Sequence, residues 1–121
     1  MERTEAVELL ERRRNAWLRE DVDAYLSTFA EDFVFQADGV EESRGKASLE
    51  AIIRRSYEQF RPVNWEFHDI AVHGSNVLAE WTVTVEDRYT RATSTMNAMY
   101  ISEVRNGVST WIREYRAQRR K

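Results

Sequence analysis

The carboxyl-terminal half of the chain alternates apolar and polar residues in long stretches that are separated by turn signals. Alternation with a period of two is typical of strands that bury one face. Asn106-Gly107 is a strong signal for a two-residue hairpin, because both central positions of that turn need positive φ. The pattern predicts a meander of long antiparallel strands. The expected strands are 63–73, 77–86, about 93–104 and 109–116.

The amino-terminal half repeats its apolar residues at helical spacing instead. Asp21 is a good N-cap for the second of the expected helices. Pro62 ends the third, because proline disfavours helical geometry in the residue before it. Helices followed by hairpin-connected strands predict the α+β class and one domain over residues 1–121. The expected helices are 2–18, 21–29 and about 46–60, with a short strand at 33–35.

Charge and composition exclude several classes of protein. The net charge is −3 with both signs mixed along the chain, which argues against a nucleic-acid binder. No apolar run approaches the roughly 20 residues of a membrane span, and the first residues do not resemble a secretory signal. The absence of cysteine excludes disulfides and fits a cytoplasmic protein. The basic cluster at the terminus is interpreted as solvated and consists of Arg116, Arg119, Arg120 and Lys121.

Strand parity assigns one face of the sheet to the helices and leaves a second, unusually apolar face outside. The inner face is expected to carry Trp81 and Tyr100, whose strand faces hold no charge. A contiguous apolar outer face usually marks an interface, so we expect a homodimer through the outside of the sheet. The alternative is that the outer aromatics are scattered or covered by the carboxyl-terminal tail. The expected outer residues are Trp65, Phe67, Met99, Ile101, Trp111 and Tyr115.

Several local phrases, in this order, resemble one family of proteins. The passage from Asp21 to Phe33, the segment Arg44-Gly45-Lys46, and the closing hairpin that ends in Glu114-Tyr115 are similar to SnoaL-like proteins and limonene epoxide hydrolases. The resemblance implies the cone-shaped fold of nuclear transport factor 2, in which three amino-terminal helices pack on a curved antiparallel sheet. It also implies a pocket for a small apolar or polycyclic molecule and cofactor-independent cyclisation, isomerisation, hydration or epoxide opening.

Two catalytic patterns known in this fold are incomplete in the chain. Glu114 matches the final-strand acid of the limonene epoxide hydrolases, whereas Trp81 and Val83 stand where their arginine and second acid are expected. In the ketosteroid isomerase pattern, Arg13 and Ala37 stand in place of the tyrosine and the carboxylate. Asp38 lies one residue after the carboxylate position.

Glu114 is nevertheless the leading catalytic candidate. A carboxyl group on a pocket-facing strand among aromatics is desolvated, which raises its pKa and suits proton transfer. The alternative is a buried ion pair with Arg13 or Arg14, which interrupt the apolar stripe of the first helix. His68 is a second candidate, as a base or hydrogen-bond donor, and otherwise a histidine at the sheet edge. Asp38 is the third candidate, and otherwise a turn residue.

A set of aromatic and apolar residues is expected to line the pocket, together with one arginine. Trp81 and Tyr100 combine an apolar body with a polar group and are the strongest candidates for ligand contact. We expect no metal, because cysteine is absent and the two histidines fall on opposite strand faces. No cofactor is expected either. The predicted substrate-binding residues are Trp17, Tyr25, Tyr57, Trp81, Met96, Tyr100, Ile112 and Arg13.

Two functions remain open from the sequence. One is an acid–base enzyme in which Glu114 moves a proton while His68 or Tyr100 polarises an oxygen. The other is a non-catalytic dimeric module that binds a small molecule or a partner. The incomplete catalytic patterns favour the second, and the inward-facing Glu114 with many aromatics favours the first.

Overall fold

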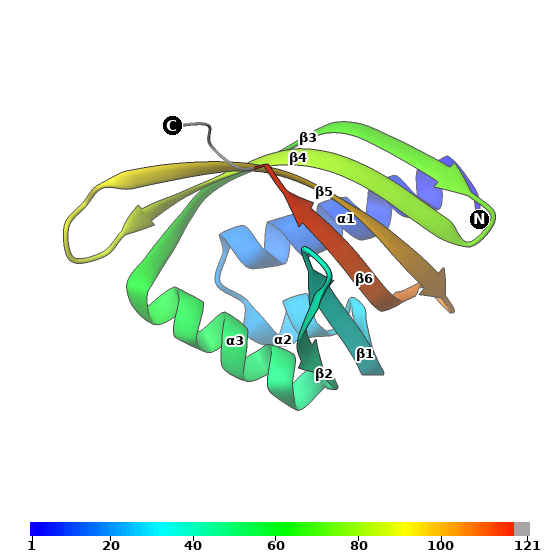
Figure 1. Cartoon of the computed structure of the whole chain (residues 1–121), viewed down its shortest axis with the longest axis horizontal. Coiled ribbons are helices and arrows are strands. Elements are labelled where there is room, and N and C mark those ends of the chain that lie inside the picture. The colour runs from blue at the N-terminus through cyan, green and yellow to red at the C-terminus, as the bar shows by residue number, and fades with distance from the viewer. Residues whose placement is uncertain (118–121) are drawn as a thin grey trace.

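A six-stranded sheet curves over three helices in the computed structural model, which describes residues 1–117 (Figure 1). The strand order is β2-β1-β6-β5-β4-β3, and the sheet stays open with β2 and β3 at its edges. Neighbours pair antiparallel except β1 and β6, which pair parallel. The predicted α+β fold is confirmed. The elements are α1 Arg3–Leu18, α2 Val22–Leu26, β1 Phe29–Ala37, β2 Val40–Arg44, α3 Lys46–Gln59, β3 Phe60–His73, β4 Asn76–Asp87, β5 Thr93–Arg105 and β6 Val108–Arg116.

The helices begin where the sequence indicated, but the second one ends earlier. Asp21 caps α2 by accepting a hydrogen bond from the backbone N–H of Ala24 at 3.1 Å. Phe29 was expected to close this helix and instead begins β1. Its ring packs 5.2 Å from Tyr25 and 4.5 Å from Phe33. The helical spacing of Tyr25 and Phe29 therefore extended the predicted helix beyond the point at which the chain crosses from helix to strand.

The hairpin turns follow the expected backbone geometry. Asn106 and Gly107 both have positive φ, 53° and 78°, as the two-residue turn requires. Asp38 and Gly39 repeat this pattern with φ of 50° and 83° and join β1 to β2. Strand β2 was not predicted, because a short strand rich in charged residues at a sheet edge lacks the apolar alternation of a half-buried strand.

Strand β3 corrects the predicted outer face. Its pairing with β4 is irregular between Pro62 and Asn64 and again between Phe67 and Asp69. Each bulge adds one residue and so reverses which side chains face the helices. Trp65 is therefore buried, and Phe67 packs against the core, although both were expected outside. Pro62 lies within β3 because this edge strand needs no N–H there.

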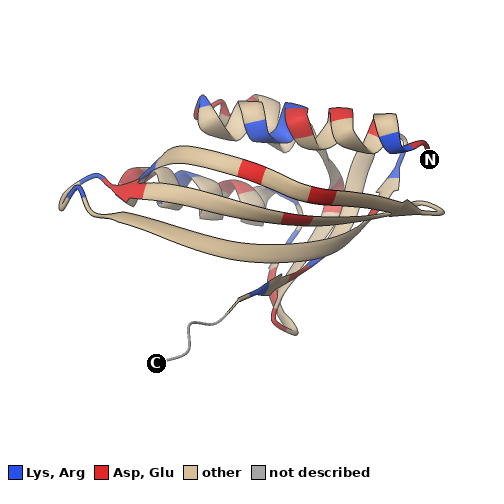
Figure 2. Ribbon diagram, turned by 90° about the horizontal axis from the view of Figure 1, so that it is seen from above, with Lys and Arg blue, Asp and Glu red and all other residues tan. Residues whose placement is uncertain are grey.

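The remaining outer face is apolar in part and carries little positive charge. Met99 and Tyr115 are 43% and 48% exposed, as their predicted orientation requires. Figure 2 shows acidic but no basic residues in the middle of the long strands, whereas α1 mixes both signs. Of the predicted basic cluster, residues 119–121 lie outside the described residues. No helix within residues 1–117 combines the length and apolar character needed to cross a membrane.

Candidate active site

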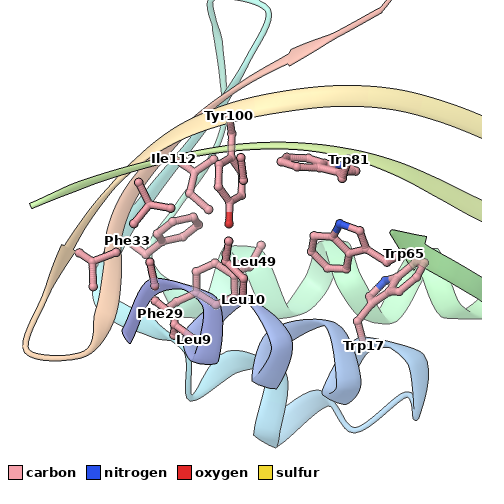
Figure 3. Close-up of a cluster of buried hydrophobic side chains, with 14 of the residues drawn as sticks. Leu9, Leu10, Trp17, Phe29, Phe33, Leu49, Trp65, Trp81, Tyr100 and Ile112 are labelled. Carbon is pink, nitrogen blue, oxygen red and sulfur yellow. The ribbon is translucent and has the colours of Figure 1, made fainter. Parts of the chain in front are cut away.

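A cavity of about 70 Å³ lies between the inner face of the sheet and the helices. Aromatic rings from both layers form most of its wall, and Figure 3 shows Tyr100 projecting from the sheet toward the helices beside Trp65 and Trp81. The cavity is small compared with pockets for drug-sized ligands, which reach at least about 300 Å³. It is lined by Arg13, Tyr25, Phe29, Phe33, Phe35, Leu49, Trp65, Trp81, Tyr100, Ile112 and Glu114.

Arg13 enters this wall from α1 and is only 1% exposed. Its Nε donates to the hydroxyl of Thr28 at 2.9 Å, and its Nη2 donates to the Thr28 carbonyl at 2.9 Å and to the hydroxyl of Ser109 at 2.7 Å. Its Nη1 donates to the hydroxyl of Tyr100 at 3.2 Å. The guanidinium also lies 4.1 Å from the ring centroid of Phe29. This buried cation is thus held by neutral oxygens and an aromatic ring.

Glu114 faces the cavity from β6. Its side chain is 12% exposed, and burial raises the pKa of its carboxyl group above the ordinary glutamate value. Arg116 opposes this shift by donating from Nε to Oε2 at 2.7 Å, whereas the nearby carboxyls of Asp38 and Glu42 add to it. Within residues 1–117, Glu114 pairs with Arg116 and not with Arg13. The alternative of an ion pair with the first helix is therefore wrong in its partner.

The other polar groups of the wall are hydroxyls and indole nitrogens. Burial raises the pKa of Tyr25 to about 12 and also raises that of Tyr100, so both phenols stay protonated at neutral pH. The indole Nε1 of Trp65 is buried and has no hydrogen-bond partner among the described residues. An unpaired buried donor is uncommon and costly. The cavity therefore offers a carboxyl group at one position and free donors at others.

The structure gathers most of the predicted site residues around this cavity and separates the rest. The residues that line it are Glu114, Arg13, Tyr25, Trp81, Tyr100 and Ile112. Trp17 instead packs edge-on against Trp65 with 5.6 Å between centroids, and Tyr57 donates to the carbonyl of Trp17 at 2.9 Å. Met96 packs against the core without reaching the cavity wall.

His68 lies on the opposite side of the sheet from Glu114. As the bulged residue of β3 it points outward, where its Nε2 lies 2.7 Å from the hydroxyl of Thr82. Thr82 donates its own proton to Asn97 at 2.7 Å, so the histidine must be the donor in the first contact. These residues border an open groove of about 540 Å³ on the outer face. The prediction that His68 acts in the same pocket as Glu114 is therefore wrong, because the bulge turns His68 to the outer face.

Asp38 occupies the turn above the cavity and is exposed. Its N–H donates to the carbonyl of Glu114 at 2.9 Å, and its carboxylate accepts from the N–H of Arg116 at 3.1 Å. The residue therefore ties the end of β1 to the end of β6. Its negative charge also acts on the carboxyl group of Glu114.

Part of the wall was missing from the predicted binding set. Phe33 and Leu49 are buried core residues that also reach the cavity, and Phe35 is half-buried beside them. Phe33 and Phe35 were predicted only as part of a short strand, and Leu49 as part of the apolar face of the third helix, because an apolar pattern does not distinguish a core position from a cavity wall. Trp65 was assigned to the outer face, because the sequence pattern of β3 does not predict the bulges that turn this residue inward.

Comparisons with known proteins agree with this architecture. A family model described as SnoaL-like domain matches residues 10–112. An LEH-like epoxide hydrolase from M. tuberculosis is 26% identical with a TM-score of 0.82, and the match covers 97% of this chain and 86% of that one. A candidate polyketide cyclase from Xanthomonas campestris pv. campestris is 25% identical with a TM-score of 0.75, covering 93% and 90% of the two chains.

A third structure extends the likeness of fold. A candidate isomerase from Bacillus subtilis has a TM-score of 0.84 at 19% identity, covering 97% of this chain and 90% of that one. No curated protein matches the sequence. Within the part of the chain that the structure describes, no group of three or more His, Cys, Asp or Glu side chains is placed to hold a metal ion.

Proposed function

Because the chain belongs to the family of SnoaL-like domains, we propose that it is a cofactor-independent enzyme that moves a proton on a small, largely apolar molecule. The observation that carries the proposal is the carboxyl group of Glu114, which is 12% exposed in an aromatic cavity. Desolvation in such a site raises the pKa of an acid toward the range in which it can both take and return a proton.

The reaction class follows from what the carboxyl group can reach. As a carboxylate, Glu114 can accept a proton from an acidic C–H bond, which serves isomerisation or cyclisation, or from a water that attacks an epoxide or double bond. Tyr100 is the group that polarises the substrate oxygen, since it shares the cavity with Glu114 whereas His68 lies on the outer face. The related epoxide hydrolase and candidate polyketide cyclase support these reaction classes.

The rival function is a pocket that binds a small molecule without changing it. The ion pair between Glu114 and Arg116 favours this rival function, because it gives the carboxylate a structural role at the end of β6 that needs no catalysis. So does the presence of Trp81 and Val83 where the epoxide hydrolases are expected to place an arginine and a second acid.

Replacing Glu114 by Gln separates the two functions. The assay follows hydrogen–deuterium exchange at the α-carbon of small ketones, and hydration of small epoxides, with purified protein. We expect Glu114→Gln to abolish turnover while the melting temperature is kept or raised, and the exposed outer-face change Glu80→Gln to leave turnover intact. Full turnover in Glu114→Gln, with a lowered melting temperature, favours the binding module because Glu114 is then structural.

The dimer also remains part of the proposal. Once Trp65 and Phe67 are removed from it, the outer face still presents Met99 and Tyr115, with Ile101 and Trp111 half-buried beside them. Exposed apolar side chains on long strands suit pairing with a second copy across this face.

A further inference from the structure

Arg13 is a buried cation without a counter-charge. Its four hydrogen bonds run to hydroxyl and carbonyl oxygens, which are all neutral. Within residues 1–117, no carboxylate forms an ion pair with it, and Glu114, the acid that lines the same cavity, pairs with Arg116 instead. Neutral oxygens satisfy the N–H groups of a guanidinium but leave its charge unbalanced, and an unpaired buried charge is costly. The cavity wall therefore holds a positive charge that no described residue neutralises.

The end of Arg13 that reaches Tyr100 also keeps a free donor. A guanidinium carries five N–H groups, and four of those of Arg13 already donate to protein oxygens. The fifth is on Nη1, the nitrogen that lies 3.2 Å from the hydroxyl of Tyr100. Because this hydroxyl oxygen accepts from Arg13, its own proton is available, and no described residue takes it. Two neighbouring donors of the wall therefore lack an acceptor.

The charge of Arg13 acts on one side of the cavity and not on the other. Burial raises the pKa of Tyr25 and of Tyr100, and the positive charge of Arg13 opposes this shift in both phenols. The charged groups that act on Glu114 lie instead at the mouth of the cavity. The cavity is therefore positive on the side of α1 and the two phenols, whereas its carboxyl group lies on the side of β6.

The size and lining of the cavity limit which anion can enter. A cavity of about 70 Å³ has the volume of roughly two water molecules in the liquid, which suits a carboxylate group on a short chain. A carboxylate brings two acceptor oxygens, and its hydrogen bonds to a guanidinium are charge-assisted. The indole N–H of Trp65 is a further buried donor of the wall without a partner among the described residues.

We propose that the cavity binds short-chain carboxylates, whose anionic group accepts from Arg13 Nη1 and the hydroxyl of Tyr100 and supplies the counter-charge that Arg13 lacks. This deepens the proposed function by naming the charge of the bound molecule, and it rests on that function only for the role of this molecule as a substrate. With the anionic group held at Arg13, the chain of the acid is left for the Glu114 side of the cavity. An ionised Glu114 weakens this binding by like-charge repulsion.

Acetate and acetamide test the charge of the ligand, because they match in size and only acetate is an anion. At constant ionic strength, we expect the wild type to bind acetate at least about tenfold more tightly than acetamide, as a charge-assisted hydrogen bond predicts. Arg13→Met should remove this preference. Arg12→Met, a change on the exposed side of α1, should keep it. At pH 8, Glu114→Gln should bind acetate more tightly than the wild type does and acetamide equally well.

Measurements on the wild type keep the inference testable if Arg13→Met fails to fold. Acetate should raise the melting temperature to a plateau and acetamide should not, because a ligand that binds only the native state stabilises it. In a nitrogen–proton correlation spectrum, the Nε–H signal of Arg13 should move when acetate is added and stay when acetamide is added. Equal binding of the two probes overturns the proposal. So does an acetate preference that persists in folded Arg13→Met, or one without a shift of this signal.

The binding test is independent of the proposed proton transfer, because it measures affinity and not turnover. An acetate preference that depends on Arg13, without exchange of ketone protons by the wild type, overturns the proton transfer and keeps the anion site. Exchange that depends on Glu114, without an acetate preference, keeps the proposed function and overturns the anion site. An acetate preference together with exchange that is lost in Glu114→Gln supports both.

Discussion

Arg116 and Glu114, two residues apart on β6, form an ion pair in which Arg116 Nε donates to Glu114 Oε2 at 2.7 Å. The arginine side chain is 39% exposed and the glutamate side chain 12%, so the pair spans the boundary between solvent and cavity. Because alternate residues of a strand share a face, an arginine two positions away is a ready partner for a pocket-facing acid. A substitution of Arg116, which does not line the cavity, should therefore change the pKa of Glu114.

The proposed proton-transfer activity should rise with pH through a pKa above the ordinary glutamate value of about 4.3. Burial raises the pKa of Glu114, and only the ionised form accepts a proton. The pH dependence of kcat/KM for hydrogen–deuterium exchange at the α-carbon of a small ketone reports this pKa in the free protein. Glu80→Gln on the outer face should leave the profile unchanged. A profile that is flat from pH 4 upward would contradict the assignment.

Two changes at the cavity mouth should move that pKa in opposite directions. The negative charge of Asp38 helps to raise the pKa of Glu114, so Asp38→Asn should lower it, and asparagine tolerates the positive φ of this turn. The hydrogen bond and charge of Arg116 lower the pKa, so Arg116→Gln should raise it. The midpoints of the pH profiles should therefore follow the order Asp38→Asn, wild type, Arg116→Gln. If Asp38→Asn instead abolishes turnover, Asp38 acts on the substrate directly.

Glu114 should also impose a pH dependence on stability. Its folded-state pKa lies above its unfolded value, so the native state binds more protons in the interval between the two values. Stability is therefore fully present below the unfolded pKa and falls as pH rises through the folded pKa. Urea unfolding of wild type and Glu114→Gln, compared from pH 4 to pH 8, should show a decline in the wild type that the variant lacks. Parallel curves would mean that the carboxyl group is not desolvated.

The sequence was sufficient for the layers of the fold and for one wall of the site. The apolar alternation of β4 and β5 placed Trp81 and Tyr100 on the inner face, and Asn106-Gly107 located the last hairpin. These features depend on neighbours along the chain, which periodicity and turn chemistry report directly.

Features that depend on how one strand pairs with another could not be predicted from the sequence in the same way. The two bulges in β3 arise from its register with β4, and they moved Trp65 inward and His68 outward against the simple alternation. Strand β2 is charged and mostly exposed because it lies at the edge of the sheet and packs little against the core. Arg13 was predicted to line the pocket, with an ion pair between Glu114 and Arg13 or Arg14 as the alternative. Its hydrogen-bond partners are instead Thr28, Tyr100 and Ser109, which are far apart in the sequence.

The outer face should hold two copies of the chain together. Met99 and Tyr115 are exposed there, and a charge placed on a buried interface is costly. Light scattering at micromolar concentration should show a dimer for the wild type and a monomer for Met99→Glu with Tyr115→Glu. Tyr89→Glu is the matched control, because Tyr89 is 80% exposed in the loop between β4 and β5. A monomeric wild type would contradict the interface.

Replacement of Arg13 by Met should destabilise the fold by about 3 kcal/mol, because the change leaves the oxygens of Thr28, Tyr100 and Ser109 without their donor in a buried site. Arg13→Lys should recover only part of the loss, since a single ammonium group cannot reproduce the guanidinium fork. Arg12→Met is the matched control on the exposed side of α1 and should stay within about 0.5 kcal/mol of wild type. Urea unfolding at one pH measures all three variants. Equal stability of Arg13→Met and wild type would show that the hydrogen bonds of this arginine contribute little to the fold.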